Sequence, residues 1–241
     1  MTRTYENILK SIANNQKMLA VLIDPDKMQI DNVEGFVMKI NNSIATHIFV
    51  GGSTVAEHLS EELVIELRKY TDLPIVLFPG DVSQITNKAD ALLFLSLISG
   101  NNPDYLINKH VAAVENLNDS NLDVIPTGYM LVENGKPTMV EKVTNTRPLS
   151  RTNIQLVCDT AKAGELLGMK LIYLEAGSGA IDPVPKEMIT AVKQKLSIPL
   201  IVGGGIKTKS QLEDAYESGA DLVVIGTALE QDESFFDVLK S

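Results

Sequence analysis

Cysteine, tryptophan and long apolar runs are scarce or missing in this sequence. Its 241 residues include no Trp and a single Cys, Cys158. One cysteine excludes an internal disulfide and a metal site built from several thiolates, and it fits a reducing compartment. Because Cys158 ends the apolar run 154–158, we expect it on a buried helix face rather than as a nucleophile.

Two further absences concern membranes and nucleic acids. No apolar run approaches the roughly 20 residues of a membrane-spanning helix, and residues 1–10 contain no signal-peptide core. We therefore expect a cytoplasmic protein without an integral membrane segment, whose contact with a membrane surface is at most transient. A count of 21 Lys and Arg against 31 Asp and Glu gives a net charge of −10, which argues against nucleic acid as a partner. Such an acidic chain must bind phosphate through local backbone N–H groups, helix N-termini or a metal ion.

The remaining composition describes a globular protein. Hydrophobic residues make up 44% of the chain and charged residues 22%, as in soluble domains. A chain of this length can bury a sizeable core, and α/β barrels routinely reach it as one domain. We predict a single barrel domain over residues 1–241.

Short apolar runs alternate with amphipathic segments along the chain. The expected strands are residues 19–23, 47–50, 75–78, 91–95, 123–131, 170–174, 200–202 and 222–225. The expected helices are residues 32–41, 55–69, 104–116, 154–167, 185–195, 209–218 and 233–239. Asn153 is a suitable N-cap for the fourth of these helices, and Gly168 a suitable residue just past its end. Strands that alternate with helices in this way pair in parallel and close into a (β/α)8 or TIM barrel. An open doubly wound sheet is the alternative, disfavoured because no G-x-G-x-x-G follows the first strand.

The third unit of this barrel is unusually short. Residues 79–90 separate the third and fourth expected strands and leave room for a short helix at 82–88. We therefore predict a modified barrel whose third helix is short or missing, with a thin or open outer ring at that point. The fifth unit is long instead, with a turn at 132–137 and a polar loop at 144–151.

Barrels keep their chemistry at the carboxyl ends of the strands. The first strand ends in LIDPDK, residues 22–27, where two carboxylates and a lysine could bind a divalent cation and a diphosphate. The second ends in VGGST, residues 50–54, where the Ser53 hydroxyl offers a metal or oxyanion contact. Each segment has a plain alternative, because a D-P-D turn and a helix start need no ligand.

The stretch YLEAGSG, residues 173–179, offers the richest chemistry. Gly177 and Gly179 have no Cβ, so backbone N–H groups there can approach an anion closely. Ser178 adds a hydroxyl donor, and Glu175 at the strand end could accept a proton beside that anion. An ordinary glycine-rich turn with a solvated glutamate is the alternative. VGGGI at 202–206 and IGT at 225–227 favour the functional interpretation, because glycine turns after strands seven and eight form the usual barrel phosphate site.

Together these motifs resemble the geranylgeranylglyceryl phosphate synthase family, which includes the bacterial heptaprenylglyceryl phosphate synthases. The resemblance runs from about residue 20 to residue 227. It implies a modified TIM barrel whose third helix is missing or replaced. It also implies Mg²⁺-dependent transfer of a prenyl group from a prenyl diphosphate to the 3-hydroxyl of sn-glycerol 1-phosphate.

The resemblance assigns roles by position. Asp24 and Ser53 match the Mg²⁺ site, and Asp24 and Glu175 are the candidate catalytic residues. The positions that match the sn-glycerol 1-phosphate site are Tyr173, Leu174, Glu175, Ala176, Gly177, Ser178, Gly179, Gly204, Gly205, Gly226 and Thr227. One branch of the family carries a lysine two residues before the metal aspartate. Leu22 stands there in this chain, which therefore resembles the larger-subunit branch, where geranylgeranyl transfer is the usual activity. We expect a homo-oligomer, either a dimer or a hexamer.

The residues allow a matching chemistry. Glu175 could take the hydroxyl proton or stabilise developing allylic positive charge. The prenyl tail needs an apolar groove, and the strand residues available near the short third unit are Leu77, Phe78, Leu93 and Leu95.

Other residues carry weaker signals. His47, His58 and His110 lack metal-ligand spacing and are expected to be packing or surface residues. Tyr105, Tyr129 and Arg147 could reach the active face, but nothing in their local sequence requires it.

Other functions remain open at this point. The first is a heptaprenylglyceryl phosphate synthase. The second is an isomerase or lyase of amino-acid biosynthesis that uses the same phosphate site without a metal-binding Asp24. The third is a non-catalytic lipid-diphosphate binding module, against which the position of Glu175 argues.

Overall fold

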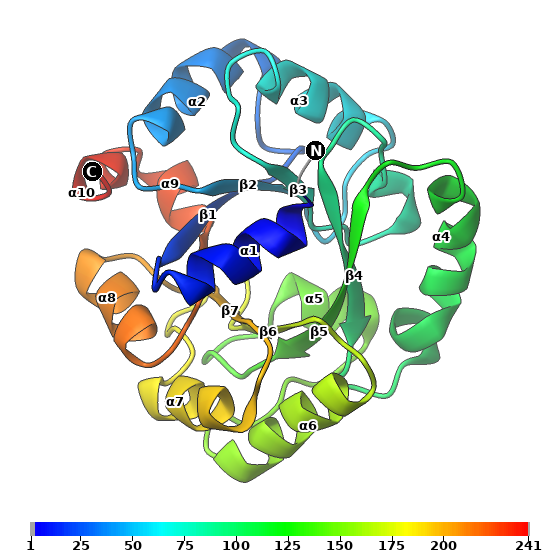
Figure 1. The fold of residues 1–241 in the computed structure, drawn as a ribbon, viewed down its shortest axis with the longest axis vertical. Helices are drawn as coiled ribbons and strands as arrows, with labels where there is room; N and C mark the ends of the chain where they lie inside the picture. The colour runs from blue at the N-terminus through cyan, green and yellow to red at the C-terminus, as the bar shows by residue number, and fades with distance from the viewer. Residues whose placement is uncertain (1–2, 241) are drawn as a thin grey trace.

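Parallel strands close into a barrel in the computed structural model, which describes residues 3–240 (Figure 1). Each strand pairs with the next along the chain, and β8 returns to pair with β1. The strands are β1 (Met18–Ile23), β2 (His47–Val50), β3 (Ile75–Leu77), β4 (Ala91–Leu97), β5 (Asp123–Leu131), β6 (Leu171–Glu175), β7 (Leu200–Gly203) and β8 (Leu222–Ile225). The predicted TIM-type barrel is confirmed, and the open doubly wound sheet is excluded.

Helices surround this barrel (Figure 1). Those that the sequence predicted are α2 (Val33–Asn41), α3 (Leu59–Leu67), α4 (Lys109–Leu117), α6 (Ile154–Leu166), α7 (Lys186–Lys195), α8 (Lys209–Glu217) and α10 (Phe235–Val238). The caps of α6 are as predicted, because the Asn153 side chain accepts the Leu156 N–H at 3.2 Å and Gly168 has φ 97°. Cys158 is buried on the same helix. The predicted start of α3 at residue 55 is wrong, since His58 adopts a left-handed φ of 70° just before the helix.

Several short elements were not predicted. They are α1 (Thr4–Ala13), α5 (Met139–Thr144), α9 (Thr227–Gln231), the 3₁₀ turn η1 (Ile30–Asn32) and the π-helical turn η3 (Asp104–Asn108). The turn η3 occupies the first part of the helix expected at 104–116, so α4 begins five residues late, at Lys109. Among residues 3–240, no helix has the length and apolarity needed to cross a membrane.

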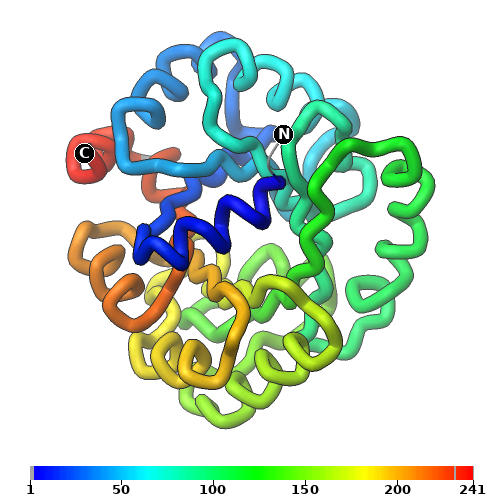
Figure 2. The backbone as a smooth tube through the Cα atoms, in the orientation of Figure 1, coloured from blue at the N-terminus to red at the C-terminus, as the bar shows by residue number. Residues whose placement is uncertain are grey.

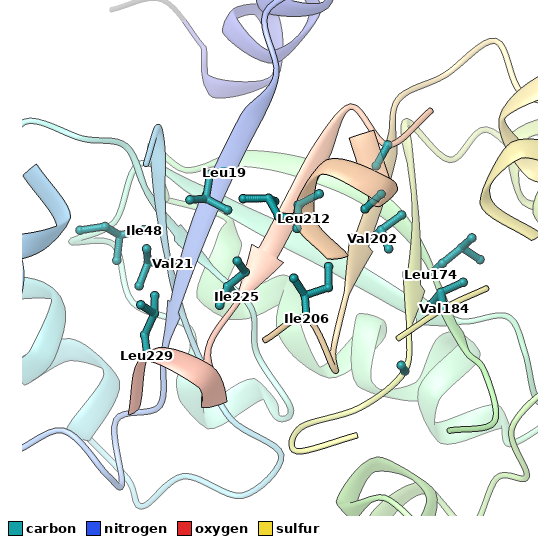
Figure 3. Packing of buried hydrophobic residues seen from close by; sticks show 14 of the residues in the cluster. Leu19, Val21, Ile48, Leu174, Val184, Val202, Ile206, Leu212, Ile225 and Leu229 are labelled. Carbon is teal, nitrogen blue, oxygen red and sulfur yellow. The ribbon is translucent and has the colours of Figure 1, made fainter. Parts of the chain in front are cut away.

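Side chains of each strand alternate between two apolar layers, as the pleat of a strand requires. In β1, Leu19 and Val21 pack outward in the layer that also holds Leu212 of α8 and Leu229 of α9 (Figure 3). Met18 and Ala20, which alternate with them along the strand, belong to the layer inside the barrel. Burial on both faces explains why the strands read as nearly continuous apolar runs.

Helix α1 lies across the amino-terminal end of the barrel (Figure 1, Figure 2). Its Ile8 packs with Met18 and other residues of the inner layer. Tyr5 fixes the helix to the strands, because its N–H donates to the Asp123 carboxylate at 2.8 Å and its hydroxyl donates to the Lys170 carbonyl at 3.2 Å. The helix therefore covers this end and leaves access to the barrel at the carboxyl end.

The third helix of the barrel is replaced by a 3₁₀ turn, η2 (Val82–Gln84). The Asp81 side chain accepts the Ser83 N–H at 3.5 Å, which starts the turn. Thr86 then donates to the Glu61 carboxylate of α3 at 2.6 Å and ties the segment to its neighbour. The expected short third unit is confirmed, so the outer ring is thin between α3 and α4.

Replacing Ile8 with alanine should lower the free energy of unfolding by about 2–5 kcal/mol, because it leaves a cavity under α1. Leu9→Ala lies on the same helix at a side chain that is 41% exposed, against 2% for Ile8, and serves as the control. That change should cost about 0.5 kcal/mol or less. Urea unfolding followed by circular dichroism measures both values. Equal losses for the two variants would contradict a sealing role for α1.

Candidate active site

One cavity of about 610 Å³ opens at the carboxyl end of the barrel. Parallel strands bring their carboxyl ends to the same rim, so each strand or the turn after it contributes to the lining. From β1 to β8, the strand or the turn after it supplies in order Asp24, Gly52, Phe78, Leu95, Tyr129, Glu175, Gly204 and Gly226. The cavity therefore joins the ends of all strands of the barrel in one space.

Asp24 follows β1 and holds a small network of charges. Its Oδ1 accepts the Asp26 N–H at 3.1 Å, and its Oδ2 lies 3.1 Å from Lys27 Nζ. Lys27 also pairs with Glu230 of α9 at 3.0 Å. Burial lowers the pKa of Lys27, but the contacts with Glu230 and Asp24 outweigh it and raise the pKa overall. A charged ammonium group is thus held beside Asp24 at the rim.

Ser53 follows β2 and lines the cavity together with Asp24. A Cβ at Gly52 would lie 2.8 Å from Asp24 Oδ1, so the backbone of this turn lies directly against the carboxylate. Within residues 3–240, no group of three or more His, Cys, Asp or Glu side chains is placed to hold a metal ion. A single carboxylate and a hydroxyl fit Mg²⁺, which takes its other ligands from phosphate oxygens and water.

Glycine turns after β6 and β7 form the polar end of the cavity. Positive φ angles occur at Gly177 (100°), Gly179 (64°), Gly204 (79°) and Gly205 (75°). Side chains at these positions would strain the backbone. A Cβ at Gly204 would also collide with the Gly177 backbone, so the two turns pack backbone against backbone. Such a rim presents peptide groups rather than side chains to a ligand.

The turn after β8 joins this arrangement. Thr227 opens α9, and its Oγ1 lies 2.9 Å from the Oγ of Ser178 in the β6 turn. Both hydroxyls border the cavity. Hydroxyl and backbone groups from three neighbouring turns therefore surround one polar pocket, which is an arrangement suited to a phosphate.

Glu175 ends β6 at the edge of this pocket. The side chain is 5% exposed, and its Oε1 accepts the Gly177 N–H at 2.5 Å. Burial raises the pKa of Glu175, and the nearby Tyr173 hydroxyl and Gly177 N–H offset that effect only in part. A buried carboxylate with a raised pKa is a stronger base than a solvated one.

Tyr173 supports the floor of the cavity from inside the barrel. Its ring stacks on Phe78 and meets Tyr129 edge-on, with centroid distances of 5.3 Å and 5.4 Å. Within the described chain its hydroxyl makes no hydrogen bond of regular geometry, although it lies close to Glu175. Burial raises the pKa of the Tyr173 hydroxyl well above its usual range, so it stays protonated.

Leu174 and Ala176 are placed differently from the rest of the YLEAGSG stretch. Their side chains pack in the layer between strands and helices and do not line the cavity. The Ala176 N–H donates to the Gly203 carbonyl at 3.0 Å, and its carbonyl accepts the Asn134 amide. These two residues shape the turn, while the other candidate binding residues face the cavity.

The apolar part of the cavity runs toward β4 and α4. Phe78, Leu93 and Leu95 line it, as do Ile85, Phe94 and Ala113. Phe94 belongs to the outer face of β4 and Ala113 to α4, so the cavity leaves the barrel interior beside the short third unit. The expectation that Leu77 lines this groove is wrong, because Leu77 packs outward in the helix layer.

The histidines, tyrosines and arginine that had no clear motif in the sequence lie partly in the cavity and partly elsewhere. Tyr105, Tyr129 and His110 line the cavity, whereas Arg147, His47 and His58 do not. His110 Nε2 lies 3.0 Å from Ser96 Oγ, so the ring is held by a protein contact. The three histidines remain dispersed, in agreement with the absence of metal-ligand spacing.

The turn after β5 contributes residues that the sequence analysis did not single out. Lys136 Nζ lies 3.4 Å from where a Cβ at Gly179 would be, and Thr138 packs against Gly177. Both residues line the cavity. The available signal was the position of Lys136 in a glycine turn directly after a strand. Lys136 brings a positive charge to the polar end of an acidic protein.

Comparison with known proteins gives matches over nearly the full chain. A geranylgeranylglyceryl phosphate synthase of Flavobacterium johnsoniae is 55% identical over 237 residues, which cover 98% of this chain and 98% of that protein. The corresponding protein of Zunongwangia profunda is 51% identical over 233 residues, covering 97% of this chain and 99% of its own.

A solved structure is similar as well. The (S)-3-O-geranylgeranylglyceryl phosphate synthase of Thermoplasma acidophilum, in complex with substrate sn-glycerol-1-phosphate, superposes with a TM-score of 0.92 at 30% identity. The match covers 99% of this chain and 96% of that structure. The model of the PcrB family matches residues 11–241, a span that holds every strand of the barrel and every turn of the cavity rim. The chain therefore belongs to the PcrB family.

Proposed function

We propose that this chain joins sn-glycerol 1-phosphate to geranylgeranyl diphosphate through an ether bond and releases diphosphate. The observation that carries the proposal is the continuity of the cavity. Its glycine turns, Glu175, Asp24 and the apolar channel toward α4 border one space of about 610 Å³. The names of the relatives and the sn-glycerol-1-phosphate in the similar structure support the same substrates.

The glycerol phosphate is proposed to bind at the polar end. Its phosphate would lie against the turns after β6, β7 and β8, where backbone groups and the Ser178 and Thr227 hydroxyls face the cavity. Lys136 adds a nearby positive charge. These local donors explain how a chain of net charge −10 can hold a phosphate.

Glu175 is proposed to act on the 3-hydroxyl. The bond between the prenyl C1 and its diphosphate oxygen breaks, a bond from the glycerol oxygen to C1 forms, and the hydroxyl proton passes to the Glu175 carboxylate. The raised pKa of this buried carboxyl favours proton uptake. Its negative charge also stabilises positive charge that develops on the allylic carbon.

Mg²⁺ is proposed to bind at Asp24 and Ser53. When bound, the ion would draw the negative charge of the leaving diphosphate onto itself. Lys27 lies beside Asp24 and offers a second positive group to the same diphosphate. The diphosphate would then lie at the β1–β2 edge of the rim, across the cavity from the β6 turn.

The prenyl tail is proposed to follow the apolar channel past β4. Each buried CH₂ group contributes about 0.8 kcal/mol before entropy costs. Ile85 just after η2, Phe94 of β4 and Ala113 of α4 border this route. Their size would set the longest tail that fits.

Assembly and location stay predictions. A homo-oligomer, either a dimer or a hexamer, is supported by exposed apolar side chains that recur at helical spacing on η3 and α4: Ile107, Val111 and Val114. A cytoplasmic location is proposed from the sequence alone.

Asp24→Asn should lower kcat by about 100-fold or more, because the variant loses the charge that would bind Mg²⁺ and pair with Lys27. The affinity for sn-glycerol 1-phosphate should stay close to that of the wild type, because the phosphate turns lie elsewhere on the rim. Turnover of labelled sn-glycerol 1-phosphate into an organic-soluble product measures the loss, and calorimetry measures the affinity. Asp31→Asn, at an exposed carboxylate on η1, is the control. Full activity of Asp24→Asn, or of the wild type in excess EDTA, would refute the metal assignment.

Glu175→Gln should lower kcat and kcat/KM together by about 100-fold, the scale of a lost general base. Glu187→Gln, at an exposed position of α7, should leave both constants unchanged. If kcat holds and only the KM for sn-glycerol 1-phosphate rises, Glu175 orients the substrate and does not act in the transition state.

The same substitution should raise the melting temperature at pH 7. The folded pKa of Glu175 lies above the unfolded value, so its contribution to stability is present at low pH and is lost as the pH rises through the folded pKa. Glutamine is neutral throughout and avoids that loss. The difference between variant and wild type should shrink as the pH falls toward about 4, the range of an ordinary Glu.

Competition between C20 and C35 prenyl diphosphates tests the channel. The C20 substrate should give the higher kcat/KM, because the side chains of β4 and α4 that border the channel would limit the length of the tail that fits. A preference for C35 would move the chain to heptaprenyl transfer with the same chemistry at Glu175.

A further inference from the structure

Gln84 has no role in the reaction proposed above, although it lies close to the candidate site. It ends η2, the turn that replaces the third helix, and it is 3% exposed. Its Nε2 donates to the Gly52 carbonyl at 3.0 Å. Its Oε1 accepts the Gly80 N–H at 3.2 Å and the Gly52 N–H at 3.5 Å. One buried amide therefore holds the peptide groups of two different turns.

The two turns held by this amide are packed without space between them. A Cβ at Gly80 would lie 2.5 Å from the Gly52 carbonyl oxygen and 2.9 Å from the Ser53 carbonyl oxygen. A Cβ at Gly51 would collide with the carbonyl group of Phe78. The position of the β2 turn is therefore fixed by the β3 turn on one side.

On its other side the β2 turn meets Asp24. A Cβ at Gly52 would lie 2.8 Å from Asp24 Oδ1. Asp24 therefore lies against Gly52, and Ser53 directly follows it, so both residues to which the proposed function assigns Mg²⁺ adjoin the peptide groups that Gln84 holds. A shift of Gly52 would change the separation of the carboxylate and the hydroxyl.

The β3 turn is in turn held from α4. Lys109 Nζ donates to the Gly80 carbonyl at 3.2 Å and pairs with Asp81. Gly80 therefore has its N–H bound by Gln84 and its carbonyl bound by Lys109. This makes the β3 turn a fixed support against which Gln84 can hold the β2 turn.

We propose that Gln84 is a positioning residue for the cation and diphosphate end of the site. It fixes the Gly52–Ser53 peptide against Asp24, and Asp24 and Ser53 would hold the cation. The inference rests on the proposed function in taking Asp24 and Ser53 as the cation ligands. Residues that orient a metal ligand typically contribute a factor of about 10–100 in metal affinity or activity.

Gln84→Met keeps the length of the side chain and removes all three hydrogen bonds. We expect it to weaken binding of Mn²⁺ in the presence of inorganic diphosphate about 10-fold or more. Gln84→Glu keeps the acceptor and loses the donor to the Gly52 carbonyl, so its loss should be smaller. Electron paramagnetic resonance of free Mn²⁺ measures this binding without turnover. Calorimetry with sn-glycerol 1-phosphate should show an affinity within about twofold of the wild type for both variants, since the ligands of the phosphate turns do not include this amide.

Thr86→Val is the matched control. Thr86 is buried two residues further along the same segment, and its hydroxyl donates to Glu61 of α3 and accepts the Lys88 N–H. Its loss should lower the melting temperature and leave Mn²⁺ binding unchanged. A purely structural role for Gln84 would instead lower the melting temperature and both ligand affinities together.

The results distinguish the positioning role of Gln84 from the proposed activity. Wild-type Mn²⁺ binding by folded Gln84→Met would overturn the positioning role while the proposed activity stands. If Gln84→Met does not fold, Gln84→Glu decides, and unchanged binding there overturns the role as well. If the wild type itself binds no Mn²⁺ with diphosphate, the metal assignment fails and the positioning role fails with it, although ether formation can still be assayed independently.

Discussion

The pairing of β1 with β8 is the interaction on which the candidate site depends, because it closes the sheet. Their register sets Val21 opposite Ile225, so the turns after the two strands meet although the chain between them is long. Lys27 and Glu230, 203 residues apart, form an ion pair as a direct result. Leu22 packs against Gly226 in the same place, where a Cβ on the glycine would lie 3.2 Å from the Leu22 carbonyl oxygen. Without this closure the carboxylate side and the phosphate side of the rim would be separate surfaces.

Close backbone packing decides what the rim can bind. The turns after β2 and β3 touch at Gly52 and Gly80, and the turns after β6 and β7 touch at Gly177 and Gly204. Glycine at such positions carries an entropy cost on folding, but it allows peptide N–H groups to reach the cavity. The polar end therefore has local dipoles suited to an anion, and the overall acidity of the chain has little influence at that range.

The burial of Glu175 likewise costs stability and gives a chemical property in return. Removing a carboxylate from water destabilises its charged form, as its raised pKa indicates. A single backbone N–H, that of Gly177, supports it directly. The strand end thus holds a group that is poorly solvated in the resting state and is well placed to accept a proton.

The sequence predicted what depends on local pattern. Strand positions followed from apolar runs with turn residues between them, and the caps Asn153 and Gly168 followed from local hydrogen bonding. Glycine turns at strand ends located the polar end of the cavity, because parallel strands must bring those ends together.

Contacts between distant segments could not be predicted from the same patterns. Helix α1 has ordinary amphipathic composition, and only packing of Ile8 on strands that follow it shows its role. Leu77 was assigned to the wrong side of β3, because an apolar strand buried on both faces has no alternation to mark its direction. Gln84 acts through the peptide groups of two other turns, and nothing in its local sequence indicates those contacts.

The short third unit has a consequence for how such a protein changes over generations. Residues that border the channel lie on η2, β4 and α4, whereas the phosphate turns and Glu175 belong to the opposite half of the barrel. A substitution at Leu95 or Ala113 can alter the room along the channel without disturbing the turns at Gly177 and Gly204. Under the proposed function, changes along this channel would alter the tail that fits while the residues proposed for bond formation stay the same. Tail length and bond formation would then depend on separate walls of the barrel.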